Sequence, residues 1–379
     1  MADLKKNRII AIVTNIPNPY RIPLFNELNI QLLRNKIELN VVFGAKNYKR
    51  RKFKLSENEF KFNYIFLNST KINFGNTEKT LFTYKGLLKN LRKIKPDKIV
   101  IIGFSLGTLK LWIRSFWNKT PIIIWSGSIT TKGRKDSFLR EIYRKILIKK
   151  VSGFIAYGTK AKEYLINLGA DPDKVNIAIN TVDTKFFGVE SEKLKVKITS
   201  PKTKELLSIG YLTEKKRIDL ILKAVEILSK KRQDFKLIIV GDGQYRKELE
   251  DLSEKIGVNK FVKFEGFKQK KDIPGYLARA SCFLFPSEYD IWGLVLNEAM
   301  ATGVPCISSI HAGATHDLII EGKTGFALDF EDTDKVVEKI NWILDNPEEV
   351  KKIGKEASDF IKNNANIKKS VEGFLKPIN

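Results

Sequence analysis

Two carboxylates, Asp290 and Glu298, lie on either side of Gly293 in the segment 286–305, directly after the apolar run 282–285. We expect a helix to begin at Gly293. Its free backbone N–H groups and positive dipole end would form an anion site, while the carboxylates would accept hydrogen bonds from vicinal hydroxyls of sugars or riboses. Spacing alone leaves a structural alternative open, in which Asp290 only caps the helix and Glu298 is a buried, paired carboxylate.

These residues need a scaffold, and short β-branched runs that alternate with helical segments predict one. Strands are expected at 9–13, 39–43, 98–102, 121–125 and 153–157, and again at 206–209, 235–240, 262–264, 282–285 and 305–308. Helical patterns fall between them, for example at 218–230 and 245–256. Nearly continuous apolar strands separated by helices indicate parallel sheets covered on both faces.

The pattern occurs twice, which predicts an α/β protein with two Rossmann-like, doubly wound domains. A polar, lysine-rich stretch at 191–204 separates the two halves, so we expect domains at 1–190 and 198–361. The segment 350–375 has a helical pattern, and its end, about 362–379, is expected to pack back on the first domain. Ligands bind beyond the carboxyl ends of such strands, and two facing sheets would form a cleft.

The segment 286–305 resembles the signature of the retaining glycosyltransferase family four, which has the GT-B fold. That signature has two acids separated by seven residues, an aromatic-Gly pair between them and Glu-Ala-Met-Ala-x-Gly-x-Pro after them. The resemblance implies that Asp290 contacts the donor sugar and that Glu298 binds the ribose hydroxyls. It also implies that the backbone at Trp292, Gly293 and Leu294 meets the donor sugar and diphosphate. Asp290 stands where Glu is usual, in an Asp-x-Trp-Gly form that is similar to bacterial surface-polysaccharide glycosyltransferases.

Three further segments resemble donor-site elements of the same family in the same order. In 208–220, Lys216 matches the lysine that binds the diphosphate, and such a cation neutralises charge on the leaving group. Tyr211 replaces a usual Arg, and Arg217, where Gly is usual, is a candidate replacement for that cation. The alternative to diphosphate binding is a solvated basic turn, and this alternative suits Lys215 better than Lys216. The resemblance also assigns donor contacts to Gly210, to Gly241 in the loop 239–244, and to Phe267, whose backbone would hold the base.

In the first half, the segment 16–25 resembles a Pro-Tyr-Arg version of the family's first loop. Arg21 is the candidate to reach the diphosphate or an anionic acceptor, although proline near a helix start explains the segment equally well. The family's usual histidine is absent, since His311 and His316 are the only two in the sequence. The resemblance implies same-face attack, in which the leaving phosphate takes the acceptor's proton, and such a reaction would need no protein base. The acidic run 329–334 is expected to cap a helix, and we predict no metal requirement and no cofactor besides a UDP- or GDP-sugar as substrate.

The net charge of +25 is concentrated in the first half. Residues 1–190 hold 36 Lys and Arg against 14 Asp and Glu, a net of +22, which leaves +3 for the rest. The segment 132–150 is a basic amphipathic helix with apolar residues at helical spacing. Its apolar side is expected to pack inward and its basic side to face an anionic membrane, with Arg50, Arg51, Lys52 and Lys54 extending the patch. Lysine-rich codon usage is the bland alternative, but it does not explain the asymmetry.

Other features narrow the function class. No apolar run approaches the roughly 18 residues that span a bilayer, and Cys282 and Cys306 form no disulfide framework, so a cytoplasmic protein, peripheral on the inner membrane face, is expected. We expect a hexosyl- or N-acetylhexosaminyltransferase that acts on a saccharide or lipid-linked saccharide in cell-surface glycan synthesis. The alternatives are a nucleotide-sugar epimerase, a sugar phosphorylase, an inactive scaffold and a nucleic-acid-binding protein. The last lacks the aromatic-basic interleaving of a single-strand platform.

Overall fold

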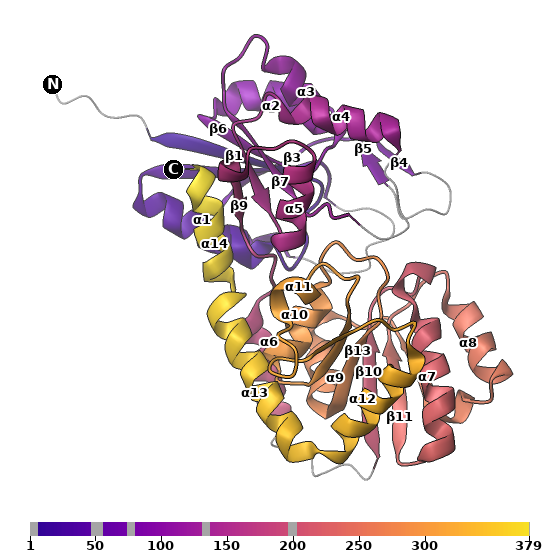
Figure 1. The fold of residues 1–379 in the computed structure, drawn as a ribbon. Coiled ribbons are helices and arrows are strands. Elements are labelled where there is room, and N and C mark those ends of the chain that lie inside the picture. Colours follow the sequence, from indigo (N-terminus) through magenta and orange to yellow (C-terminus); the bar gives the residue numbers. More distant parts are fainter. Residues whose placement is uncertain (1–6, 47–55, 74–79, 131–136, 196–202, 379) are drawn as a thin grey trace. The chain divides into compact units, whose positions relative to one another are not determined.

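The computed structural model describes residues 7–46, 56–73, 80–130, 137–195 and 203–378. They divide into two compact units, the first made of residues 1–180 and 367–379 and the second of residues 181–366 (Figure 1). The expected basic residues at 50–52 and 54 lie outside the described ranges. The division at Asn180 falls before the predicted boundary at 190, because helix α6 (Thr184–Lys195) packs on helices of the second unit.

The first unit is built on a seven-stranded parallel sheet in the order β3-β2-β1-β6-β7-β8-β9. Strand bounds are β1 Arg8–Thr14, β2 Ile37–Phe43, β3 Asn63–Phe66, β6 Lys98–Ile102, β7 Ile122–Ser126, β8 Gly153–Ala156 and β9 Val175–Ile177, and an antiparallel pair joins β4 Lys71–Asn73 to β5 Thr80–Phe82. The helices are α1 Ile22–Arg34, α2 Leu87–Ile94, α3 Leu106–Arg114, α4 Phe138–Ile148, α5 Thr159–Asn167 and α14 Ile367–Ile378.

The second unit has a six-stranded parallel sheet in the order β12-β11-β10-β13-β14-β15. Its strands are β10 Lys204–Ile209, β11 Phe235–Val240, β12 Val262–Gly266, β13 Ala280–Phe285, β14 Cys306–Ser309 and β15 Phe326–Leu328. Its helices, after α6, are α7 Ile218–Lys231, α8 Arg246–Lys255, α9 Ile273–Arg279, α10 Leu294–Ala301, α11 Thr315–Leu318, α12 Thr333–Asp345 and α13 Pro347–Asn364. Both units are Rossmann-like, which confirms the predicted fold class.

Both sheets reverse their strand order beside their first strand, between β1 and β6 and between β10 and β13. Ligands of open parallel sheets bind at such a switch point, beyond the carboxyl ends of the strands. In the second unit, the segments that follow β10 and β13 are the ones that contain Lys216 and Asp290. The topology therefore brings the two most informative motifs of the sequence to one edge of one sheet.

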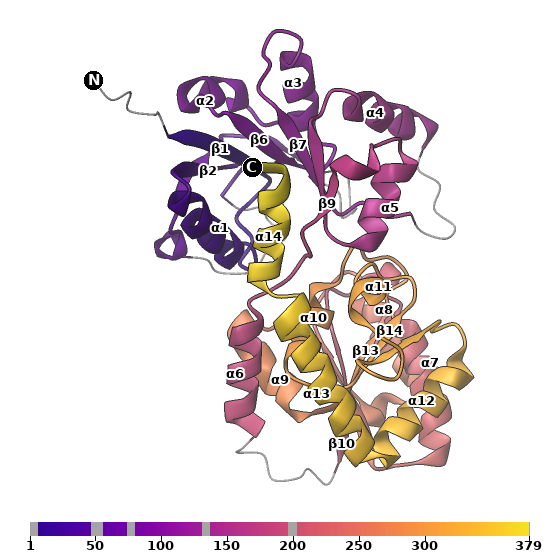
Figure 2. The same ribbon diagram turned by 60° about the vertical axis from the view of Figure 1, so that its left-hand side comes forward.

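The helical pattern at 350–375 forms two helices rather than one. The break falls at Ala365 and Asn366, where Ala365 leaves the helical conformation and its carbonyl accepts a hydrogen bond from Thr181. α13 packs against α10 and α6 in the second unit, whereas α14 packs against α1, β8 and β9 in the first (Figure 2). Phe374 of α14 is fully buried with its ring centroid 4.7 Å from that of Trp125, so α14 completes the core of the first unit.

The acidic run 329–334 caps a helix, as predicted. The Asp332 carboxylate accepts a hydrogen bond from the backbone N–H of Lys335 at the start of α12. Among the described residues, no helix has both the length and the apolar character required to cross a bilayer.

Candidate functional site

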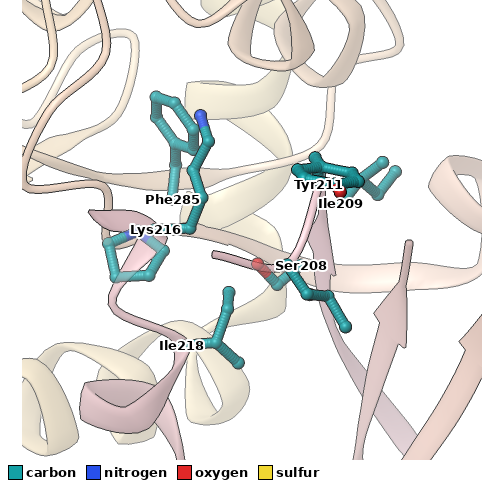
Figure 3. A pocket seen from close by; sticks show the side chains of 9 residues that line it. Ser208, Ile209, Tyr211, Lys216, Ile218 and Phe285 are labelled. Carbon is teal, nitrogen blue, oxygen red and sulfur yellow. The ribbon is translucent and has the colours of Figure 1, made fainter. Parts of the chain in front are cut away.

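A small open pocket lies at the carboxyl edge of the second sheet, and Lys216 projects into it (Figure 3). The ammonium of Lys216 lies 5.4 Å from the centroid of the Phe285 ring, and Tyr211 is on the other side of the pocket. The lining residues come from the ends of β10 and β13 and the segment after β10: Ser208, Ile209, Gly210, Tyr211, Leu212, Lys216, Ile218, Phe285 and Pro286. A cation beside exposed backbone at a switch point suits an anionic ligand.

The segments after β10 and β13 are held together by hydrogen bonds and by an ion pair. The backbone N–H of Glu288 donates to the carbonyl of Lys215 at 3.0 Å, and the Lys216 ammonium forms an ion pair with the Asp290 carboxylate. Asp290 also accepts a hydrogen bond from the backbone N–H of Trp292 at 3.3 Å. The structure thus brings together Lys216 and Asp290, which the sequence separates by 74 positions.

Gly293 turns the chain into α10 in a conformation that other residues rarely adopt. Its φ is +97°, and a Cβ atom there would lie 2.5 Å from two carbons of the Phe285 ring. The N-cap glycine supplies no side-chain acceptor to the first N–H groups of α10. The N–H of Leu296 donates to the Gly293 carbonyl at 3.0 Å, which leaves the N–H groups of Leu294 and Val295 and the helix dipole for an anion. Leu294, the first helical residue, is half-buried.

Trp292 is an anchor for this turn, because its side chain is 2% exposed and its indole N–H donates to Asn297 at 2.8 Å. The backbone around it is pinned to the segment before α11: the N–H of Gly313 donates to Asp290 and that of Ala314 donates to Trp292, both at 2.9 Å. The backbone that the resemblance assigns to the donor sugar is therefore rigidly held.

Glu298 lies on the second turn of α10, half-buried and without a hydrogen bond or ion pair to another described residue. Burial raises the pKa of its carboxyl group to about 8, and the charge of Lys270 lowers it in part. The alternative in which Glu298 is a paired structural carboxylate is therefore wrong. A half-buried carboxyl group without a protein partner is free to exchange hydrogen bonds with a ligand.

Arg217 occupies a left-handed backbone position, with φ +48° and ψ +39°, at the start of α7. Such a conformation explains why glycine is usual here, since it strains other residues by about 1 kcal/mol. The guanidinium contacts three carboxylates, with Glu331 at 2.8 Å, Asp219 at 3.2 Å and Glu288 at 3.6 Å. From the sequence, Arg217 is a candidate to replace the arginine that is usual where Tyr211 stands. In the structure, the Arg217 guanidinium is already engaged by these ion pairs.

The remaining donor-site residues lie along the same edge. Gly241 follows β11, and a Cβ atom there would lie 1.8 Å from the carbonyl oxygen of Gly210, so its first role is to let two loops approach. Phe267 follows β12 and is 43% exposed. Two residues of the site were not predicted from the sequence. Phe285 lines the pocket, and its place at the end of a predicted strand was a signal. Lys270 lowers the pKa of Glu298, and the sequence has no signal for it.

Arg21 lies in the first unit and does not extend from its surface. Only 4% of it is exposed. Its guanidinium donates to Thr14 at 2.9 Å and to the Tyr157 hydroxyl at 2.5 Å, and it lies 4.3 Å from the Trp125 ring centroid. No described carboxylate pairs with it, and its Nε has no hydrogen-bond partner in the described chain. Arg21 is an enclosed cation at the carboxyl end of β1.

The prediction that the apolar side of the basic helix packs inward is wrong for most of its apolar residues. On α4, Phe138, Leu139, Ile142 and Ile146 are exposed, whereas Leu147 and Ile148 are buried. The helix packs on the unit through the opposite face, where Tyr143 donates a hydrogen bond to the Ser105 carbonyl at 3.1 Å. Residues 132–136 of this segment lie outside the described ranges.

Residues 190–360, which make up most of the second unit, match the family model described as glycosyl transferases group 1. Two curated relatives are the amylovoran biosynthesis glycosyltransferase AmsK of Erwinia amylovora, 33% identical over 157 residues, and the putative colanic acid biosynthesis glycosyltransferase WcaL of Salmonella typhimurium, 28% identical over 182. These matches cover 39% and 46% of this chain. They span 37% and 43% of the relatives' own length, less than half of each protein.

A crystal structure of Anabaena HepE in complex with UDP is similar over 97% of this chain and 99% of that chain, with a TM-score of 0.76 and 17% identity. At this identity the likeness concerns the fold, which is that of GT-B glycosyltransferases across both units.

Proposed function

We propose that the chain is a retaining glycosyltransferase that moves a sugar from a nucleotide-sugar donor to a saccharide or lipid-linked saccharide acceptor in surface-glycan synthesis. The observation that carries this proposal is the geometry at the switch point of the second sheet. There, Lys216 projects into an open pocket, Asp290 is its partner, and the N-terminus of α10 follows three residues later. The group 1 family match and the bacterial polysaccharide relatives support the same conclusion.

Each group has a chemical task in this proposal. Lys216 and the first N–H groups of α10 neutralise the diphosphate as it leaves. Glu298 accepts hydrogen bonds from the ribose hydroxyls, and the exposed Phe267 lies at the end of β12 where its backbone holds the base. Asp290 contacts the donor sugar, with the backbone of Trp292, Gly293 and Leu294. Gly210 and Gly241 keep the loops beside the diphosphate narrow enough for close approach.

The N-terminal unit takes the acceptor in this proposal, with domains at about 1–180 and 181–366. Arg21, which is enclosed by Thr14, Trp125 and Tyr157, acts as a positioning residue at the carboxyl end of β1. Attack on the same face of the sugar lets the leaving phosphate accept the acceptor's proton, so positioning and electrostatics carry the reaction. The reaction needs no metal and no cofactor, and the enzyme works at the inner face of the membrane.

A calorimetric panel of nucleoside diphosphates and nucleotide sugars tests the donor site. We expect one UDP- or GDP-sugar and its diphosphate to bind, with Glu298→Ala abolishing measurable binding. Failure of every nucleotide to bind would contradict the proposal. Proton NMR of the product from the bound donor then tests the reaction: the anomeric configuration is retained in a transferred sugar, whereas release of free sugar and nucleotide without an acceptor would favour an epimerase.

A further inference from the structure

Exposed apolar side chains gather on two neighbouring helices of the first unit, α3 and α4, and on the turn that follows α3. Of the sixteen large apolar residues that are exposed in the described chain, seven lie between residues 113 and 146. We call them the α3–α4 surface: Ile113, Phe116, Trp117, Phe138, Leu139, Ile142 and Ile146. Soluble proteins seldom expose contiguous apolar patches without a partner, so the α3–α4 surface needs an explanation that the donor site does not provide.

On α4, the apolar and basic residues share one face. Phe138, Ile142 and Ile146 recur every four residues, and Lys145 and Lys149 fall within the same stripe of a helix with 3.6 residues per turn. Phe138 and Leu139 are 75% and 76% exposed. An outward face of this composition is typical of helices that lie in a membrane interface.

The end of α3 continues this surface. α3 and α4 lie side by side (Figure 1; Figure 2), and the Lys150 ammonium at the end of α4 lies 3.8 Å from the centroid of the Phe116 ring. Trp117, directly after Phe116, is 82% exposed. Tryptophan is enriched at the membrane–water interface, because its ring is amphipathic.

The charge around the α3–α4 surface is of one sign. Within 110–130 and 137–150, the described ranges that include α3 and α4, there are eight Lys and Arg but only Glu141 as an acid. Glu141 is already paired with Lys145 at 2.6 Å. Basic residues that flank exposed apolar ones favour an anionic lipid surface over a neutral one.

We propose that the α3–α4 surface docks the protein on an anionic lipid bilayer, with Trp117, Phe138 and Leu139 entering the headgroup region and Lys149 facing lipid phosphates. The inference deepens the proposed function and rests on it for its biological meaning, since the surface would bring the acceptor unit to lipid-linked saccharides. Docking itself is measurable without glycosyl transfer.

Flotation of the full chain with vesicles tests this surface. We expect recovery with phosphatidylglycerol-containing vesicles and little with pure phosphatidylcholine. Phe138→Ser combined with Leu139→Ser should weaken partitioning by at least about tenfold, since two large apolar side chains no longer enter the interface. Lys149→Gln should weaken it by roughly fivefold. The matched control is Ile30→Ser with Leu33→Ser, which removes two residues of α1 that are 43% and 55% exposed and should leave partitioning unchanged.

A second measurement locates the contact. Tryptophan fluorescence should shift to shorter wavelength with anionic vesicles, and Trp117→Phe should remove most of this shift. Equal binding of the serine double variant and the parent, or no binding of the parent to either vesicle, would overturn the proposal. Sedimentation velocity provides a further outcome. If the parent self-associates and the double variant is monomeric, a second copy of the chain covers the surface and the proposal is also overturned. Unchanged nucleotide binding by the double variant separates failure of this inference from failure of the donor site.

Discussion

Lys216 and Asp290 form an ion pair that joins the segment after β10 to the segment after β13 at the switch point of the second sheet. Their side chains are 24% and 19% exposed, so neither is freely solvated. In this structure, the Asp290 carboxylate is the anion that Lys216 neutralises. A donor diphosphate has to share Lys216 with this carboxylate or displace it.

Asp290→Asn should separate binding from turnover. Loss of the competing carboxylate leaves Lys216 available to the diphosphate, and an ion pair of this exposure is worth about 1 kcal/mol or less. We expect the nucleoside diphosphate that the panel identifies to bind up to roughly fivefold more tightly, while kcat falls because a donor-sugar contact is lost. Calorimetry and steady-state kinetics on one preparation provide both values. A parallel loss of affinity and kcat would show that Asp290 organises the whole site instead.

Lys216→Ala should weaken diphosphate binding by roughly tenfold to a hundredfold, because a charge-assisted contact contributes about 1.5–3 kcal/mol. Lys215→Ala is the matched control. Lys215 is the preceding residue, is exposed, and lies 5.8 Å from the centroid of the Tyr289 ring. Calorimetric titration of both variants should show a deficit only for Lys216→Ala. Equal deficits would mean that general positive charge, and not the pocket, holds the diphosphate.

Glu298 should make stability depend on pH. Its folded pKa of about 8 is higher than the value of roughly 4.3 in an unfolded chain. Between these values the folded chain retains a proton that the unfolded chain has released, so stability is lost as pH rises through this interval.

Glu298→Gln removes this penalty. Its melting temperature relative to the parent should rise by a few degrees from about pH 5 to pH 8. Melting curves across this range, in one buffer system at constant ionic strength, measure the difference. A difference independent of pH would contradict a raised pKa, and Glu321→Gln, at an exposed glutamate, controls for the loss of a carboxyl elsewhere.

Substitutions of Arg217 measure how much its left-handed backbone conformation reduces the stability of the protein. Arg217→Gly and Arg217→Ala remove the same ion pairs to Asp219, Glu288 and Glu331. Only the glycine variant relieves the strain at φ +48°, so we expect it to be more stable than the alanine variant by about 1 kcal/mol. Urea denaturation of both variants measures this difference. A more stable alanine variant would mean that the turn relaxes when the guanidinium is gone.

The sequence predicts the central strands well because they are buried on both faces. The bounds of β6 and β11 agree with the expected 98–102 and 235–240. The edge strand β12 was predicted, at 262–264, but the other three edge strands of the two parallel sheets were missed. β3, β9 and β15 end their sheets and are half-exposed and short, so their composition does not differ from that of loops. The helix break at Ala365 was also not predicted. The hydroxyl of Thr181 donates a hydrogen bond to the Ala365 carbonyl, and these residues are 184 positions apart in the sequence.

The candidate site is only partly readable from the chain. The segments around Lys216 and Asp290 were recognisable because each follows a buried strand. Their ion pair was not, since it depends on strand order rather than on local pattern. Arg21 shows the limit most clearly: its neighbour Tyr157 lies 136 positions away, and only the fold reveals that the guanidinium is enclosed. The outward side of α4 was mispredicted because periodicity finds an apolar stripe but not the direction in which it points.

α14 gives the protein an unusual order of assembly. Phe374 belongs to the core of the first unit, yet the ribosome adds it after all of the second unit has been made. During synthesis, the first unit therefore lacks the contact between Phe374 and Trp125 until the second unit has been made. The chain also passes between the units twice, near residues 180 and 366, so one protease cut at either crossing leaves the two halves tethered.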